Sequence, residues 1–162
     1  MCVDEKIKNK NSINEPFFPY PSVEILPNAE YTSLSGWWVN PNERTDIYAY
    51  INISADNTDW STLQYDEINQ VEVVMFGRKN LKEWQYQHVG TDEEVYRDAV
   101  ELADSYNDRK NYYNILNEKT AHLKKTTKGR QHPVNLVFSL QDILHVKGTK
   151  HLIITKNGVN KL

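Results

Sequence analysis

Residues 46–54 read DIYAYINIS and residues 70–76 read QVEVVMF, and these two stretches decide the fold class of the chain. In the first stretch the side chains alternate between two faces, one with Ile47, Ala49, Ile51 and Ile53 and the other with Tyr48 and Tyr50. Alternation at every second residue is typical of a β-strand. The second stretch is rich in β-branched residues, which strands favour. We therefore expect two strands of an antiparallel sheet.

Each of these strands is expected to pair with a neighbour in the sequence. Residues 33–40 (SLSGWWVN) come before the first strand, and the turn residues 41–44 (PNER) separate the two. Residues 82–89 (KEWQYQHV) follow the second strand after 77–80 (GRKN), and Trp84, Tyr86 and His88 alternate there with polar residues. This pattern predicts two hairpins. The polar and acidic residues 55–69 between them are expected to form a loop.

A helix is expected to begin after Thr91, because Glu94 three residues later completes a capping box. Apolar residues recur at helical spacing over 95–106 and again over 113–123, which predicts one long helix or two with a break near residue 108. Further on, residues 134–138 predict a short strand, 139–146 one or two helical turns capped by Ser139, and 151–155 a last strand. The predicted fold class is α+β, with an antiparallel β-sheet of four to six strands packed on a long helix.

The domain organisation is expected to be simple. Pro16, Pro19 and Pro21 predict an irregular N-terminal arm over residues 1–22. Residues 23–162 are expected to form a single α+β domain, with a small basic C-terminal strand–short helix–strand unit over about 119–162. Cys2 is the single cysteine, which excludes an internal disulfide. No stretch has the character of a signal peptide or a membrane span, so we expect a cytoplasmic protein.

Residues 66–116 contain a series of elements known from a small domain family. A strand at 71–76 is followed by a glycine turn, an aromatic alternation at 84–89, and a helix from Glu94 that ends near Ala103 and Ser105. This segment, about a third of the chain, resembles the KTSC-type domain. The chain departs from that pattern at 106–109 (YNDR), where the family has a glycine and an aromatic residue. The resemblance implies a β-β-α unit and no activity.

Charge is divided sharply along the chain. Residues 1–108 carry 20 Asp and Glu against 8 Lys and Arg, whereas residues 109–162 carry 2 acidic and 11 basic residues. Four of the five histidines also lie in the basic part. A basic end on an otherwise acidic chain indicates contact with a polyanion or with an acidic protein surface, which can be the N-terminal part of the chain itself.

The leading functional hypothesis is a non-catalytic binding or accessory protein of a bacterial mobile element or phage that contacts nucleic acid through its basic C-terminal surface. Clustered bases beside hydroxyl groups and backbone amides are what phosphates accept. The residues expected to make these contacts are Lys119, Lys124, Lys125, Lys128, Arg130, Lys147 and Lys150. The same lysines can instead cap the negative end of a helix.

The alternative hypothesis is a protein-binding inhibitor or immunity-type factor that uses an acidic aromatic surface against a basic partner. Aromatic residues are enriched at the centres of protein interfaces, although they also fill cores. The residues of this candidate surface are Trp37, Trp38, Trp60, Tyr48 and Tyr50. Since Trp37 and Trp38 are adjacent, they would point to opposite faces of a strand.

A metal-dependent enzyme is the most distant hypothesis. The residues that could approach one ion are Glu118, His122, His132, His145 and His151. Glu118 and His122 are four residues apart, which suits two ligands on one helix face, but no HxH or HExxH motif reinforces them. The glycines do not form a phosphate-binding loop or a nucleophile elbow. We therefore expect no catalytic residue, no metal site and no cofactor.

Overall fold

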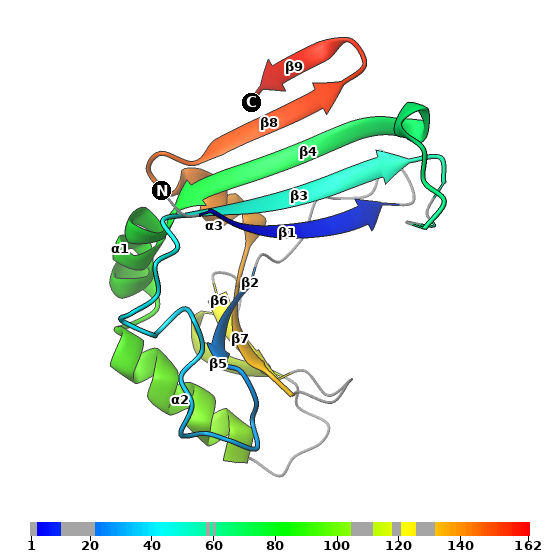
Figure 1. The fold of residues 1–162 in the computed structure, drawn as a ribbon. Coiled ribbons are helices and arrows are strands. Elements are labelled where there is room, and N and C mark those ends of the chain that lie inside the picture. Colours follow the sequence, from blue (N-terminus) through cyan, green and yellow to red (C-terminus); the bar gives the residue numbers. More distant parts are fainter. Residues whose placement is uncertain are drawn as a thin grey trace. The chain divides into compact units, whose positions relative to one another are not determined.

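The computed structural model describes residues 3–10, 22–57, 59, 61–104, 112–117, 121–125 and 132–162, with the backbone alone for 3–10 and 112–117. The chain divides into two compact units (Figure 1). Unit 1 contains Met1–Pro19, Thr45–Leu81 and Ile143–Leu162, and unit 2 contains Tyr20–Arg44 and Lys82–Asp142. Each unit is built around one β-sheet, and the fold class is α+β, as predicted.

Unit 1 holds a five-stranded sheet in the order β1-β3-β4-β8-β9 (Figure 1). Its strands are β1 (Val3–Lys10), β3 (Ile47–Ala55), β4 (Ile68–Gly77), β8 (Lys150–Thr155) and β9 (Gly158–Lys161). The strands β3, β4, β8 and β9 are antiparallel neighbours, and β1 runs parallel to β3 at one edge. The predicted strands at 46–54, 70–76 and 151–155 are thus present, but β3 pairs directly with β4 across a longer connection.

Unit 2 holds a four-stranded sheet in the order β2-β7-β6-β5, in which neighbouring strands are antiparallel. Its strands are β2 (Ser22–Leu26), β5 (Tyr112–Asn117), β6 (Ala121–Lys125) and β7 (Val134–Phe138). Helix α2 (Asp92–Asp104) contacts all of these strands. Its buried residues are Val95, Ala99, Leu102 and Ala103, which recur at helical spacing and form the face that it turns to the core.

Three helices and a short 3₁₀ turn complete the described structure: α1 (Arg78–His88), α2, α3 (Leu140–His145) and η1 (Tyr65–Glu67). The predicted capping box at the start of α2 is confirmed, because the Thr91 amide donates to Glu94 Oε2 at 2.8 Å and the Glu94 amide donates to Thr91 Oγ1 at 3.3 Å. The predicted cap of α3 is confirmed by the Asp142 amide, which donates to Ser139 Oγ at 3.1 Å. None of the helices in the described ranges is long and apolar enough to cross a membrane.

The prediction of a strand at 82–89 is wrong. Helix α1 covers most of this range, and the buried residues Leu81, Gln85 and Val89 are four apart, as on one face of a helix. The aromatic alternation that suggested a strand is a coincidence of spacing: Trp84 and His88 are also four apart, and their rings stack at 4.6 Å. The β-β-α unit implied by the KTSC resemblance is therefore replaced by a strand and two helices.

Two further predictions are corrected by the backbone. Residues 33–40 are turns and irregular chain instead of a strand. Helix α2 ends at Asp104, and the described residues of the region expected to continue it, 112–117 and 121–125, are the strands β5 and β6 instead of helix. Leu123 pairs in register with Leu136 of β7, and both are fully buried, so tertiary pairing outweighs the weak helical spacing there.

The predicted ends of the chain also differ from the structure. The prediction of an irregular arm over residues 1–22 is wrong for residues 3–10, which form the edge strand β1, and residues 11–21 lie outside the described ranges. The predicted C-terminal unit does not form a compact unit of its own, because residues up to Asp142 belong to unit 2 and those from Ile143 to unit 1. The single-domain prediction stays a prediction.

Candidate functional site

On the strands β3, β4, β8 and β9 of unit 1, one face of the sheet consists almost entirely of aliphatic side chains. Residues directly opposite each other in antiparallel strands share a face, so the register of β3, β4, β8 and β9 identifies its members. We call this surface the aliphatic face, and its members are Ile47, Ala49, Ile51, Ile53, Val71, Val73, Met75, Leu152, Ile154 and Val159. It extends across four adjacent strands without interruption.

The aliphatic face is the less buried side of this sheet. On the opposite face, Tyr48, Tyr50 and Phe76 are each only 2% exposed. On the aliphatic face, Ile154 is 36% and Val159 63% exposed, and most of the other members are half-buried: Ile47, Ile51, Ile53, Val71, Val73, Met75 and Leu152. Contiguous exposed apolar patches on natural proteins mark interaction sites. The sheet therefore buries its tyrosine-containing side and leaves its aliphatic side accessible.

Two lysines lie on the aliphatic face at the end of its rows. One row across the sheet reads Ile51, Val73, Leu152 and Lys161, and the neighbouring row reads Ala49, Met75 and Lys150. Both lysine side chains are exposed. The described side chains of β3, β4, β8 and β9 on this face include no carboxylate. The face is thus apolar over β3 and β4 and becomes positive toward β8 and β9.

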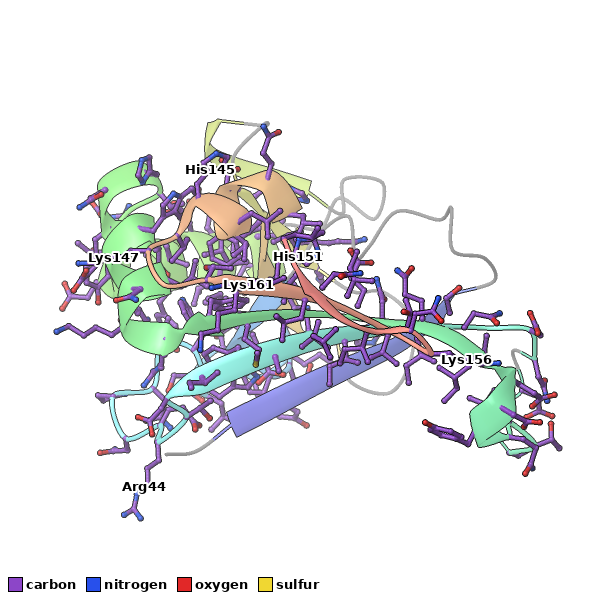
Figure 2. The ribbon with its side chains drawn as sticks, turned by 90° about the horizontal axis from the view of Figure 1, so that it is seen from above. Arg44, His145, Lys147, His151, Lys156 and Lys161 are labelled. Atoms are coloured by element: carbon purple, nitrogen blue, oxygen red, sulfur yellow. The ribbon has the colours of Figure 1, made fainter. Side chains whose placement is uncertain are left out.

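The segment 143–162, which contains these two strands, has four lysines, two histidines and no Asp or Glu. All four lysines are exposed. Lys147 and Lys161 lie toward one end of the β8–β9 hairpin and Lys156 at its turn (Figure 2). Lys156 Nζ donates to the Asp66 carbonyl at 2.7 Å. The C-terminal edge of the sheet is consequently a positively charged border of the aliphatic face.

The opposite face carries a buried polar cluster. The imidazole Nε2 of His151 lies 2.9 Å from Glu72 Oε1 in hydrogen-bonding distance, and Glu72 is directly opposite Asn52. Asn52 is 1% exposed, and among the described residues neither its amide nitrogen nor its amide oxygen has a hydrogen-bond partner. In the described part of the chain, no three His, Cys, Asp or Glu residues come close enough to hold a metal ion. The cluster is therefore a positioned carboxylate–imidazole pair beside one amide.

The lysines predicted to contact nucleic acid fall in different units. Lys124 and Lys125 lie on β6 of unit 2, whereas Lys147 and Lys150 belong to unit 1. Lys124 is exposed, but Lys125 donates from Nζ to the carbonyl of Ala103 at 3.1 Å and so caps the C-terminal end of α2. Lys119, Lys128 and Arg130 lie outside the described residues. The predicted nucleic-acid contact stays a prediction.

The predicted aromatic surface requires a correction, because three of its members are core residues. Trp38 is 0% and Tyr48 and Tyr50 are each 2% exposed. The Trp38 indole donates to Gln85 Oε1 at 2.5 Å, which satisfies its polar atom inside the core. Trp37 is half-buried and meets Trp38 edge to face at 6.1 Å, and Trp60 lies outside the described residues. Trp38, Tyr48 and Tyr50 therefore fill the interior and do not form an exposed aromatic surface.

The histidines considered as metal ligands are also divided between units. His122 and His132 belong to unit 2, His145 and His151 to unit 1, and Glu118 lies outside the described residues. Burial, together with the nearby positive charge of Lys124, holds the pKa of His122 below its usual value. The His132 carbonyl accepts a hydrogen bond from the Ala29 amide at 2.9 Å. His122 is thus half-buried within unit 2, and the backbone of His132 is hydrogen-bonded to Ala29 in the same unit.

Sequence reasoning identified the members of the aliphatic face on β3 but missed that this face is the accessible one. The missed residues include Val71, Val73 and Leu152, which read as ordinary core positions of strands. The register that aligns Val71 with Ile53, and Val73 and Leu152 with Ile51, is a long-range property. No family model, curated protein or solved structure matches this chain. The site is therefore interpreted from its own chemistry.

Proposed function

We propose that this protein is a non-catalytic binding protein whose aliphatic face contacts another protein. The observation that carries the proposal is the partial exposure of one continuous aliphatic face while the opposite side chains of β3 and β4, such as Tyr50, Val74 and Phe76, are buried. An aliphatic sheet face packs well against the apolar side of another sheet or of a helix. The proposal requires no catalytic residue and no cofactor.

The side-chain chemistry favours a protein over a nucleic acid as the occupant of this face. Proteins that hold single-stranded nucleic acid on a sheet stack the bases on aromatic rings. The aliphatic face has no aromatic member, and Tyr48 and Tyr50 lie on the buried side. Branched aliphatic side chains instead provide the close-packed contact that stabilises protein interfaces.

The test places a photoreactive benzoylphenylalanine at Ile154 in the full chain produced in cells. A control chain carries it at Leu34, which is an exposed apolar residue of unit 2. We expect the chain with benzoylphenylalanine in place of Ile154 to form one discrete adduct with a different protein. The control chain, with benzoylphenylalanine in place of Leu34, should not form this adduct. The partner is then purified, and its affinity for the unlabelled chain is measured.

The double variant Ile154→Asp/Val159→Asp is expected to bind that partner at least tenfold more weakly, because it places charges among apolar contacts. Both positions are exposed, so the fold should persist, which circular dichroism checks. Leu34→Asp is the matched control and should bind like the unchanged chain. Equal binding by all of these proteins, or an adduct with nucleic acid alone, contradicts the proposal.

A further inference from the structure

Resting on the function proposed above, we infer that the partner that occupies the aliphatic face is an acidic protein segment, with apolar side chains on one side and carboxylates positioned over β8 and β9. The inference follows from the charge of the face, from the way that charge is distributed, and from the character of its edge strand.

The charged side chains of the face are the first argument. Lys161 is directly opposite Leu152, and Lys150 directly opposite Met75, so both ammonium groups stand beside apolar members of the face. Neither lysine has an ion pair or a side-chain hydrogen bond with the described residues. A partner that covers Leu152 and Ile154 therefore meets two unpaired cations. Carboxylates satisfy such cations by charge-assisted hydrogen bonds.

The lysines around the aliphatic face also favour a negatively charged partner. Lys147 and Lys156 are exposed just before and just after β8, and residues 143–162 contain no acidic side chain that could neutralise them. Because long-range attraction steers partners of opposite charge, this border favours the approach of an acidic protein. An apolar centre with a charged border is also the usual arrangement of a transient interface.

A second copy of the chain is a poorer occupant of this face. A two-fold interface apposes a patch to itself, so the lysines of one copy would meet a face that offers no carboxylate among its described side chains. The edge strand β9 points to the same conclusion. All of its residues are exposed, and its lysine is the kind of residue by which natural sheets discourage edge-to-edge pairing. Self-association is thus disfavoured over β3, β4, β8 and β9 and along the β9 edge.

The test uses a defined probe and the full chain. A short amphipathic peptide with leucine on one side of its helix and glutamate on the other is titrated into isotope-labelled protein and followed by NMR. We expect chemical-shift changes in β4, β8 and β9, and no such changes with the same peptide carrying lysine in place of glutamate. Double-stranded DNA and vesicles of anionic lipid are titrated as competing polyanions.

Two variants separate the inference from the proposed function. Lys150→Glu/Lys161→Glu is expected to weaken binding of the acidic peptide about tenfold and to allow the lysine peptide to bind. The matched control, Lys79→Glu/Lys124→Glu, reverses two exposed lysines outside the face and should bind the acidic peptide like the unchanged chain. If the first pair has no effect while Ile154→Asp/Val159→Asp abolishes binding, the acidic partner is wrong and the binding face stands.

Three other outcomes would contradict the binding face itself or the protein nature of its partner. If Ile154→Asp/Val159→Asp leaves the shift changes intact, the face itself is not the binding surface and the proposed function fails. If light scattering finds a dimer that this variant dissociates, a second copy occupies the face. If the DNA or the vesicles shift the same residues and the acidic peptide does not, the lysines serve phosphate groups, and the inference is replaced by a polyanion site.

Discussion

Glu72 on β4 and His151 on β8 are joined across the unit 1 sheet by a hydrogen bond of 2.9 Å between Oε1 and Nε2. The side chains are only 11% and 14% exposed, respectively. Beside this pair, on the neighbouring strand, Asn52 has no partner for either polar atom of its amide in the described part of the chain. The same face thus contains one polar group that contributes to stability and one that opposes it.

Replacing Asn52 with valine is expected to stabilise the protein. A buried polar group without a hydrogen bond costs about 1–3 kcal/mol, and valine has a similar volume and favours strands. We expect a higher melting temperature and a free energy of unfolding larger by about 1 kcal/mol or more in urea titrations.

The control for this change is Asn69→Val in the same sheet. The Asn69 amide nitrogen donates to Asp56 Oδ1 at 2.7 Å, so valine there removes a satisfied contact and should give no gain. A decrease in stability for Asn52→Val would mean that its amide has a partner in solution.

Gln85 is expected to be the most sensitive polar residue of helix α1. It is 0% exposed, accepts the Trp38 indole N–H, and donates to the Gly90 carbonyl at 3.1 Å and to Asp92 Oδ1 at 3.0 Å. Gln85→Leu removes these bonds within a buried site, so we expect a loss of about 2 kcal/mol or more in the free energy of unfolding.

Gln87 on the same helix is exposed and provides the matched control. Gln87→Leu should change stability by less than about 0.5 kcal/mol, since substitutions on exposed positions without special contacts are nearly neutral. Equal effects of the two substitutions in chemical denaturation would contradict the network described for Gln85.

The helix cap at Thr91 predicts a dependence of stability on pH. The backbone amide and then the hydroxyl of Thr91 hold the pKa of Glu94 below its ordinary value of 4.5. A lowered pKa means that the stabilisation is complete above the unfolded value and is lost as pH falls through the folded value. Melting temperatures between about pH 6 and pH 3 should therefore decline less steeply for Glu94→Gln than for the unchanged chain.

Thr91→Ala should show the same flattening and should also lose about 1 kcal/mol at neutral pH, because the cap on the Glu94 amide is gone. Glu93 lies in the same first turn and is exposed, so Glu93→Gln is the control for removing one negative charge. An unchanged pH profile in Glu94→Gln would exclude this cap as a source of acid sensitivity.

Local signals in the sequence were sufficient for several elements. The capping box before α2, the alternation in β3 and the Ser139 cap of α3 all depend on residues close together in the chain. They are therefore readable without knowledge of the fold. Helix α1 could not be predicted from such signals. Its buried positions include the polar Gln85, so the buried side chains do not form a purely apolar pattern with helical spacing.

The candidate site was harder to predict than the fold class. The membership of Ile51 and Ile53 in one face follows from alternation, but the burial of the opposite face depends on packing between distant segments. Hydrophobicity alone would place the isoleucines in the core and the polar Asn52, Ser54 and Glu72 outside, whereas the structure buries these polar residues. Such an inversion is invisible to a local pattern, and it is the feature that identifies the accessible face.

The lysines of segment 143–162 provide the remaining test, which concerns nucleic acid. If Lys147, Lys150, Lys156 and Lys161 contact phosphates, binding should weaken steeply with salt, because each neutralised phosphate releases condensed counterions. Replacing all four with alanine should then weaken binding to every DNA or RNA sequence alike and reduce the salt slope, measured by fluorescence anisotropy. Lys124→Ala in unit 2 is the comparison, since the sequence placed it in the same patch and the structure places it in another unit. A complete absence of binding at about 50 mM salt would exclude the nucleic-acid hypothesis and leave the acidic protein partner as the use for these cations.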